Sequence, residues 1–505
     1  MRIYDFSDLF VLDLANNHQG DVDHALRIIE AAGQVASRCA AKVAFKFQYR
    51  ELDTFIHPTH RNQSANKHIG RFLSTRLSDA AFRRLADAVR AAGLIPMATP
   101  FDEASLQLIE ETGIEIVKIA SASATDWPLI EQVAESNRPV IFSTGGLSWK
   151  EIDDLVSFLD HRRVFHGIMH CVSIYPTPPE KLQLNQIALL RRRYASKTIG
   201  FSTHESPDAL APVQIAVAKG AQMFERHIGL DTEQYKLNAY SSTPDQIERW
   251  IRAAQEARVI CGGELRSTQP GEELTSLLEL KRGVYLRREV PAGQSLSRDH
   301  VYFAMPCEPG QLSSGTWRDG IVVSRDHDTD TPLRLDAVTL PPDSDNQPLF
   351  TAIHTVKAML NEAGIALNTD FRTEFSHHYG IARFPEVGAI LIDCINRSYC
   401  KKLVIQLPGQ RHPSHYHKRK EESFQVLWGV LELEIEGRRR TLYPGDIQVV
   451  QQGVWHEFST PTGVIFEEVS TTHHNDDSFY EDKAINRVER SERKTIVNQW
   501  GRYQF

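Results

Sequence analysis

The 505-residue sequence lacks the features that mark several classes of protein. Its six cysteines form no CxxC pair and no dense framework, so reduced thiols are expected. No apolar run approaches the ~20 residues that a membrane-spanning helix needs. The first residues, MRIYDFSDLFVLDLANNHQG, have no basic start followed by a long apolar run, so no signal peptide is expected. These absences predict a cytoplasmic protein with no membrane partner.

Positive charge is not in excess either. Lys and Arg number 57 against 65 Asp and Glu, which gives a formal net charge of −8. Binding to nucleic acid needs clustered basic residues that neutralise phosphates, and the short arginine runs at 191–193 and 438–440 are better explained as solvated faces. No nucleic-acid partner is therefore expected. A chain of this length is expected to form two to four domains.

The first 230 residues alternate short strand-like segments with amphipathic ones. Stretches such as 24–36 and 79–93 repeat apolar residues every three to four positions, which predicts helices. No GxGxxG follows the first strand, which argues against a dinucleotide-binding sheet. Eight alternations predict an α/β fold, a (β/α)8 TIM barrel over 1–265. The eight predicted strands are 10–15, 42–48, 95–100, 115–120, 139–144, 167–172, 197–203 and 221–227.

Polar residues stand at the carboxyl ends of these strands. In a (β/α)8 barrel those ends meet at one mouth, where the chemistry of such enzymes takes place. Two lysines, Lys46 and Lys118, among many hydroxyls favour a small, anionic, phosphorylated ligand. His204 and His227, on neighbouring strands, are candidates to share one divalent ion. For any one polar residue, a satisfied buried group is the alternative, but that does not explain eight polar ends together.

Eight short motifs contain these strand ends. In order along residues 8–230 they are ANNHQG, AFKFQ, ATPFD, VKIASAS, FSTGG, HCVSIYPT, FSTHE and FERHIGL. Together they resemble the sialic acid synthase family, also called N-acetylneuraminate synthases. Enzymes of that family condense phosphoenolpyruvate with an aldose such as an N-acylated mannosamine, releasing phosphate and making a nine-carbon α-keto acid, a nonulosonate. The resemblance implies the same partners here, phosphoenolpyruvate and an aldose.

The resemblance also implies roles for individual residues. His204 and His227 would bind Mn²⁺ or Mg²⁺, and Glu225 would face the metal and the sugar aldehyde. Such a metal acts as a Lewis acid, while the lysines compensate the anionic charge of the substrate. Gln19 stands where relatives carry Glu or Asn and cannot take a proton, so Glu225 is the stronger acid/base candidate. Phosphoenolpyruvate would be held by Lys46, Thr99, Lys118, Ser121, Ser143, Ser173, Tyr175 and Ser202.

A small β-rich module is predicted at 278–340 from short alternating strands and the turn PAGQ. It resembles the antifreeze-like (SAF) domain that follows the barrel in sialic acid synthases. There the domain reaches across a head-to-tail dimer and places an arginine on the sugar, so the resemblance implies a homodimer. At the aligned stretch, Met305 replaces that arginine, which argues against N-acetylmannosamine itself as the aldose. Residues 341–365 are predicted as a linker and a helix closed by Gly364.

A second candidate metal site lies in the last domain, 366–505. PSHYHKRKEESFQVLWG (413–429) precedes an alternating strand at 430–437, and side chains at 415 and 417 project to one face. The spacing resembles the cupin pattern and predicts a β-barrel that binds a divalent transition metal, Zn, Mn, Fe or Ni. A charged surface loop beside a satisfied histidine is the alternative. The predicted ligands are His415, His417, Glu422 and His456.

The sequence over about 375–483 resembles the D-lyxose isomerase type of cupin, through SHHYGIARFPEVGAILIDC, the histidine motif and VIFEEVSTTHHNDDSFYED. Those enzymes use a divalent metal to interconvert aldose and ketose through an enediol. Three hypotheses stay open: the cupin isomerises or epimerises a related sugar, it binds metal and sugar without catalysis, or the whole chain binds carbohydrate without catalysis. Proton transfer, sugar binding or a solvated rim are alternatives for Lys418, Lys420, Glu467 and Glu468.

Overall fold

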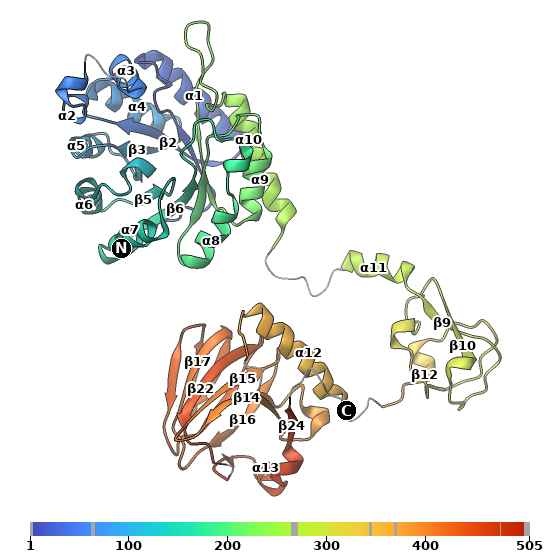
Figure 1. Cartoon of the computed structure of the whole chain (residues 1–505). Coiled ribbons are helices and arrows are strands. Elements are labelled where there is room, and N and C mark those ends of the chain that lie inside the picture. Colours follow the sequence, from blue (N-terminus) through green and yellow to red (C-terminus); the bar gives the residue numbers. More distant parts are fainter. Residues whose placement is uncertain are drawn as a thin grey trace. The chain divides into compact units, whose positions relative to one another are not determined.

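The structure of the chain, a computed structural model, divides into two compact units, Met1–Ser267 and Thr268–Phe505 (Figure 1). The predicted barrel boundary at 265, part of the predicted linker and the end of the predicted cupin domain lie outside the described residues. The structure describes residues 4–61, 66–263, 271–342, 346–367, 371–474 and 476–498.

The first unit is a closed barrel of eight parallel strands in sequential order, so the predicted TIM barrel is confirmed. Its strands are short and buried on both faces, which explains why they read as apolar runs rather than as alternating patterns. Closure pairs the first strand with the last, so that Asp13 lies opposite both Lys46 and His227. The strands are β1 (Leu9–Asp13), β2 (Lys42–Tyr49), β3 (Ile95–Pro100), β4 (Ile116–Ile119), β5 (Val140–Ser143), β6 (His166–Cys171), β7 (Ile199–Ser202) and β8 (Met223–His227).

Helices in the connections surround the barrel (Figure 1). Side-chain caps determine where several begin: Asp21 caps the first helix, and Ser148 and Thr243 form capping boxes with the residues three positions later. None of the helices in the described part of the chain has the length and apolar character of a membrane span. The helices of the first unit are α1 (Val22–Arg38), α2 (Leu52–Phe55), α3 (Lys67–Ser74), α4 (Asp79–Ala91), α5 (Ala104–Glu111), α6 (Trp127–Glu135), α7 (Trp149–His161), α8 (Asn185–Arg193), α9 (Ala211–Ala218) and α10 (Pro244–Cys261).

The second unit begins with α11 (Gly271–Leu280) and a small β-rich module, as predicted. The module contains two antiparallel pairs of strands, β9 with β10 and β11 with β12. Its own apolar core, with residues such as Val284, Leu312 and Ile321 fully buried, makes it a separate packing centre. The strands are β9 (Gly283–Leu286), β10 (Val301–Ala304), β11 (Val322–Val323) and β12 (Val338–Thr339).

The remainder of the second unit is built from two antiparallel sheets. The larger has the order β20-β17-β22-β15-β14-β13-β24 and the smaller β19-β18-β21-β16-β23. Phe424, Phe458 and Phe466 are buried in the core that joins the two sheets. The strands are β13 (Arg372–Ser376), β14 (Ala389–Asn396), β15 (Tyr399–Gln406), β16 (Arg411–Tyr416), β17 (Glu422–Gly429), β18 (Leu431–Ile435), β19 (Arg438–Leu442), β20 (Ile447–Val450), β21 (His456–Ser459), β22 (Val464–Thr471), β23 (Phe479–Tyr480) and β24 (Lys494–Asn498), and α13 (Lys483–Arg487) precedes the last strand.

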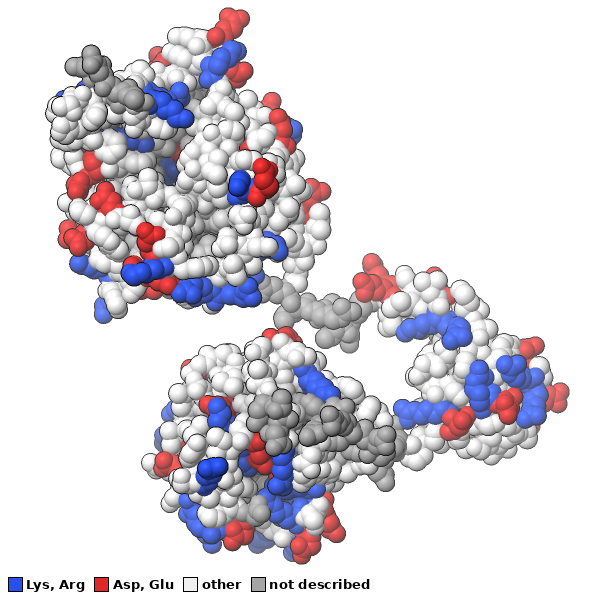
Figure 2. All heavy atoms as spheres, in the orientation of Figure 1, with Lys and Arg blue, Asp and Glu red and all other residues white. Residues whose placement is uncertain are grey.

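The outer face of the larger sheet is covered by α12 (Gln347–Glu362), as Figure 1 shows. Leu349, Ile353 and Val356 of this helix pack in one cluster with Phe375 and Ile390 of the sheet. Burying such side chains stabilises a fold by about 1.5–3 kcal/mol each. The helix predicted before the last domain therefore contributes to the core of that domain. On the surface shown in Figure 2, basic and acidic side chains are mixed over each part.

Candidate functional site

Four buried charged side chains form a continuous chain of ion pairs at the carboxyl ends of β1, β2, β4 and β8. Lys46 Nζ lies 3.0 Å from Asp13 Oδ2 and contacts Glu225 Oε1. Lys118 Nζ lies 3.0 Å from Glu225 Oε2. The order is therefore Asp13, Lys46, Glu225 and Lys118, with each charge next to one of opposite sign. Parallel strands in one closed barrel bring these residues together although they are far apart in sequence.

Glu225 is held in its ionised form. Burial alone would raise the pKa of its carboxyl, but the ammonium groups of Lys118 and Lys46 lower it below the usual range. For Lys46, burial opposes the charged form, yet Asp13 and Glu225 raise its pKa above the ordinary value. For Lys118, burial prevails over the attraction of Glu225 and lowers the pKa. Glu225 can therefore accept a proton or hydrogen bonds in this state but cannot donate.

Hydroxyl groups surround the Lys118 end of this chain. Lys118 Nζ donates to Ser143 Oγ at 2.5 Å, and the Gly145 N–H donates to Ser121 Oγ at 3.0 Å. A Cβ atom at Gly145 would lie 2.3 Å from Ser173 Oγ, so only glycine lets the backbone come this close to the hydroxyls. An ammonium group, hydroxyls and a close backbone form the kind of environment that binds phosphate and carboxylate oxygens.

The other predicted barrel residues vary in how closely they join this cluster. Thr99 and Ser202 are buried on β3 and β7, and the Thr99 hydroxyl has no hydrogen-bond partner among the described residues. Tyr175 is half exposed, and its ring centroid lies 4.2 Å from that of His204. Gln19 lies in the loop after β1 with φ 56°. In the described part of the chain, no hydrogen bond or ion pair joins the Gln19 side chain to the charged cluster.

The two barrel histidines lie next to each other beside the ion pairs. The ring centroids of His204 and His227 are 5.4 Å apart, and His227 Nε2 is 3.6 Å from Asp13 Oδ2. Burial lowers the pKa of His204 to about 3 and lowers that of His227, so both rings are neutral, as metal ligation requires. His227 Nδ1 is buried without a hydrogen-bond partner among the described residues. Two neutral imidazoles beside carboxylates fit a divalent ion.

Sequence reasoning did not single out two residues of this site. Asp13 contacts both Lys46 and His227, and an acid inside the apolar strand FVLDLA was the available signal. Tyr240 comes from the loop after β8, and its ring centroid lies 5.2 Å from that of His227 and 5.4 Å from that of Tyr175. No periodicity or motif marks Tyr240, because its place depends on how an irregular loop folds back over the mouth.

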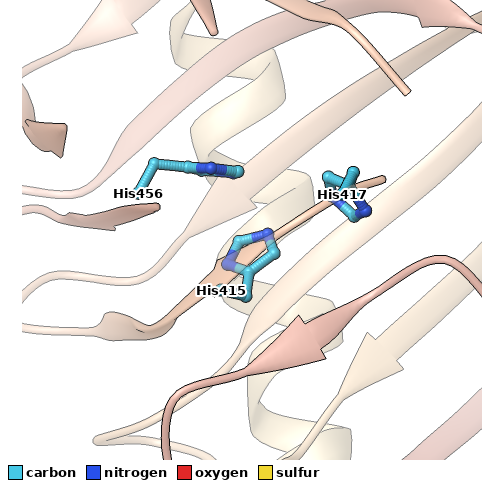
Figure 3. A group of neighbouring side chains, drawn as sticks. All are labelled: His415, His417 and His456. Atoms are coloured by element: carbon cyan, nitrogen blue, oxygen red, sulfur yellow. The ribbon is translucent and has the colours of Figure 1, made fainter. Parts of the chain in front are cut away.

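In the second unit, three histidines gather at one place between the two sheets (Figure 3). His415 lies near the end of β16, His417 directly follows that strand, and His456 begins β21. One ligand atom of each lies within 4.8 Å of the others. Each Nδ1 lies near a backbone carbonyl oxygen: 3.0 Å for His415 and Pro413, 2.5 Å for His417 and Asp477, and 3.1 Å for His456 and Val454. This arrangement leaves the three Nε2 atoms available to one ion.

Glu422 lies against this cluster, so the structure brings together all four predicted ligands. Its Oε2 is 3.2 Å from His456 Nε2, and its Oε1 is 3.5 Å from His417 Nε2. Burial would raise the pKa of Glu422, but Lys420 and His417 hold it well below the usual range. Three imidazoles and one carboxylate are a donor set that suits a divalent transition metal.

The four other charged residues of this region separate into two groups. Lys420 is buried, and its Nζ lies 2.5 Å from Glu422 Oε1 and 2.6 Å from Glu468 Oε1. Glu467 instead pairs with Lys401 at 2.5 Å, where the Lys401 side chain is 42% exposed. Lys418 Nζ lies 4.5 Å from the centroid of the Phe479 ring. Lys420 and Glu468 line the same cavity as His415 and His417.

Comparison with known proteins relates both parts of the chain to families. Residues 33–266 match the NeuB family, and residues 402–469 match the cupin domain. A solved structure from Chromobacterium violaceum, of a protein assigned as spore coat polysaccharide biosynthesis protein E, is 42% identical, with a TM-score of 0.63. The match covers 66% of this chain and 100% of that chain.

Two curated relatives are named as synthases. The N-acetylneuraminate-9-phosphate synthase of Mus musculus is 27% identical over 301 residues, which cover 57% of this chain and 80% of that protein. The N,N'-diacetyllegionaminic acid synthase of Legionella pneumophila is 25% identical over 319 residues, covering 59% of this chain and 86% of that protein. From the family match and the 42% identity to a solved relative, the chain belongs to the NeuB family.

Proposed function

We propose that the barrel condenses phosphoenolpyruvate with an aldose to give a sialic-acid-like nonulosonate and inorganic phosphate. The observation that carries this proposal is the buried chain of ion pairs that ends at Lys118 among the serine hydroxyls. The named synthase activities of the curated relatives support the same reaction class. The protein is proposed to act in the cytoplasm as a homodimer, with an SAF-like module at 278–340.

Each charged group has a place in this reaction. Lys46 and Lys118, with the hydroxyls of Ser121, Ser143 and Ser173, hold the phosphate and carboxylate of phosphoenolpyruvate. The C2=C3 electron pair of phosphoenolpyruvate forms the new bond from C3 to the aldehyde carbon, and the aldehyde C=O π bond opens to an alkoxide that takes up a proton. Water adds its oxygen at C2 and loses a proton, and the bond from C2 to the phosphate oxygen then breaks, which leaves the 2-keto group and inorganic phosphate. Glu225 is held as a carboxylate by its two lysines, so it accepts the proton of the incoming water.

Further contacts complete this proposed site. Thr99, Tyr175 and Ser202 provide hydroxyls for the same substrate. His204 and His227 would hold Mn²⁺ or Mg²⁺, with Asp13 as a nearby carboxylate. When bound, such an ion polarises the aldehyde and stabilises the negative charge that develops on its oxygen. Gln19 is expected to orient a water or hydroxyl at the edge of the site.

The substrate is proposed to be an N-acylmannosamine-like aldose whose substituents differ from those of N-acetylmannosamine. The reason is Met305, which stands where the resembling family carries a sugar-binding arginine. Its side chain is exposed in the small β-rich module. A thioether cannot form the charge-assisted hydrogen bonds that a guanidinium provides, so it suits a less polar substituent.

Phosphate release from phosphoenolpyruvate tests the barrel reaction. The purified full-length protein with Mn²⁺ is given a panel of N-acylated and plain aldoses. His227→Ala is compared with His161→Ala, an exposed histidine at the end of α7. Release that needs one aldose, is lost in His227→Ala and persists in His161→Ala is expected. If neither the wild type nor His161→Ala releases phosphate with any aldose, the reaction is ruled out for that panel.

A second activity is favoured by the histidine cluster of the cupin domain. Its residues fit Zn²⁺, Mn²⁺, Fe²⁺ or Ni²⁺, and Lys420 and Glu468 lie next to the cluster. We propose that this domain interconverts an aldose and a ketose, with non-catalytic sugar binding as the alternative. Isomerisation predicts that the metal-loaded protein forms ketose and that His415→Ala does not. Non-catalytic sugar binding predicts no ketose from either. Unchanged aldose in the presence of measured bound metal supports the binding role.

A further inference from the structure

The cavity that is lined by His415 and His417 of the histidine cluster has a second charged wall. On the inner face of the larger sheet, alternate residues of neighbouring strands point into this cavity. Lys402 of β15 is the register partner of Glu468 on β22, and Ser376 of β13 is the partner of Lys494 on β24. The charged and histidine side chains that line this wall, beyond the predicted metal ligands, include Glu374, Lys402, Lys420, Glu468, His473 and Lys494.

Formal charges in this lining cancel before any metal binds. Lysines 402, 420 and 494 face glutamates 374, 422 and 468. Lys420 is engaged by Glu422 and Glu468, and Lys494 contacts Glu374. An imidazole that ligates a metal carries no net charge of its own, so a divalent ion on the histidine cluster would add two positive charges that no lining carboxylate offsets. A buried cavity with such an excess favours an anionic ligand.

Lys402 is the lining lysine with the weakest ion pair. Its side chain is 4% exposed, and its partner, Asp393, lies 3.4 Å away on β14 with a side chain that is 30% exposed. Lys494 contacts Glu374 while its own side chain is 19% exposed. An ammonium group buried this deeply with one distant, partly solvated carboxylate is poorly compensated. A ligand anion at this wall would supply the missing charge.

His473 provides independent support at the same wall. Its Nδ1 atom is buried and has no hydrogen-bond partner among the described residues. Burial lowers the pKa of this ring to about 2, and Lys402, Lys420 and Lys494 add to the effect, so the ring is neutral in a positive environment. An unpaired buried nitrogen is unfavourable unless a ligand or a water pairs with it.

We propose that the cupin cavity binds a sugar that carries an anionic group. The anionic group faces Lys402, Lys494 and His473, and sugar oxygens face the three-histidine cluster. This inference rests on the proposed metal binding of the cupin domain and adds the charge of its ligand. A nonulosonate carries such a group as a carboxylate and a phosphorylated aldose carries it as a phosphate. The shared chemistry is therefore an anionic sugar.

Calorimetric titration of the full-length, Mn²⁺-loaded chain tests this charge preference. Lys46→Met and Lys118→Met are introduced together so that the barrel does not contribute anion binding. The probes form two matched pairs: N-acetylneuraminate with its methyl ester, and N-acetylmannosamine 6-phosphate with N-acetylmannosamine. The charged member of at least one pair is expected to bind roughly tenfold more tightly than its neutral partner. The pair of probes that shows this preference identifies whether the anionic group of the ligand is a carboxylate or a phosphate.

Adjacent lysines on β15 provide a matched control. In the same background, Lys402→Gln is expected to weaken the affinity for the charged probe roughly tenfold. The affinity for the neutral probe is expected to stay the same. Lys401→Gln removes an equal charge from the outer face of the sheet, where the side chain is 42% exposed. This variant is expected to keep the affinities for both the charged and the neutral probe. Lys494→Gln repeats the test at a second position if Lys402→Gln does not fold.

Three results would overturn the proposal. The first is equal affinity within both pairs of probes, and the second is identical behaviour of Lys402→Gln, Lys494→Gln and Lys401→Gln. The third is no binding of any probe to protein that carries the metal. Metal content is measured on each sample, so a cupin that holds no metal is recognised as a failure of the underlying metal proposal. Phosphate release by the wild type remains a separate measurement of the barrel.

Discussion

In the barrel a glutamate lies between two lysines, whereas in the cupin domain a lysine lies between two glutamates. Glu225 is paired with Lys46 and Lys118, and the Lys118 end of the chain faces serine hydroxyls. Lys420 is paired with Glu422 and Glu468, and the Glu422 end faces three histidines. This difference shows that the last charged side chain in a row of buried ion pairs decides, by its sign, which ligand that row can bind. A lysine end suits an anion and a carboxylate end suits a metal ion.

The largest expected effect comes from removing the lysine end of the barrel chain. Lys118→Met leaves Glu225 with one lysine and takes the positive charge away from the hydroxyls. Because preorganised charge is a major source of catalysis, phosphate release should fall about a thousandfold. Lys150→Met is the control, since that side chain is 83% exposed on α7. A Lys118→Met enzyme with nearly wild-type kcat would mean that this end of the chain does not hold the substrate.

Removing one of the proposed cupin ligands should have the next largest effect, which acts through loss of the cupin metal and not on the barrel. His415→Ala is expected to weaken binding of one transition-metal ion per chain at least about a hundredfold, because it removes a direct ligand. Metal content after dialysis measures this, with the exposed His354→Ala on α12 as control. Barrel phosphate release should not change. Loss of phosphate release in His415→Ala would show that the two sites are not independent.

Neutralising Asp13 should have a moderate effect on the barrel. Asp13→Asn keeps the shape but removes the charge that faces Lys46 and His227. We expect kcat to fall roughly tenfold to a hundredfold and the Mn²⁺ requirement to rise, because residues around metal ligands orient them. The aldose KM should change little. Asp23→Asn, on the exposed first turn of α1, is the control; a purely structural role would lower the melting temperature without changing the Mn²⁺ dependence.

The smallest effect is expected at Tyr240, whose ring lies over the barrel histidines. Tyr240→Leu keeps apolar bulk but removes an aromatic face and a hydroxyl. The aldose KM should rise about threefold to tenfold, in line with the loss of one aromatic contact, while kcat stays close to wild type. Tyr240→Phe should separate the ring from the hydroxyl. An unchanged KM for every aldose in Tyr240→Leu would remove this residue from the sugar site.

Local sequence patterns were sufficient for the architecture and for the residues that gather in the cupin histidine cluster. All eight barrel strands could be predicted because each is a short apolar run between amphipathic helices. His415, His417 and Glu422 lie within eight positions of one another, so the short connection from β16 to β17 keeps them close together although the two strands belong to different sheets. His456 was found from its spacing after a glycine turn. Short-range order of this kind is determined by backbone periodicity.

The amino-acid sequence by itself determined a TIM barrel, a small β-rich module and a histidine site on antiparallel strands. Only the tertiary structure decided that Asp13 contacts Lys46, that Lys420 rather than Lys418 pairs with Glu422 beside the histidine cluster, and that Lys402 and His473 line a second wall. The physical reason is that strand register and loop closure bring residues that are distant in sequence to the same buried place. There, burial and neighbouring charge decide which side chains can bind a ligand.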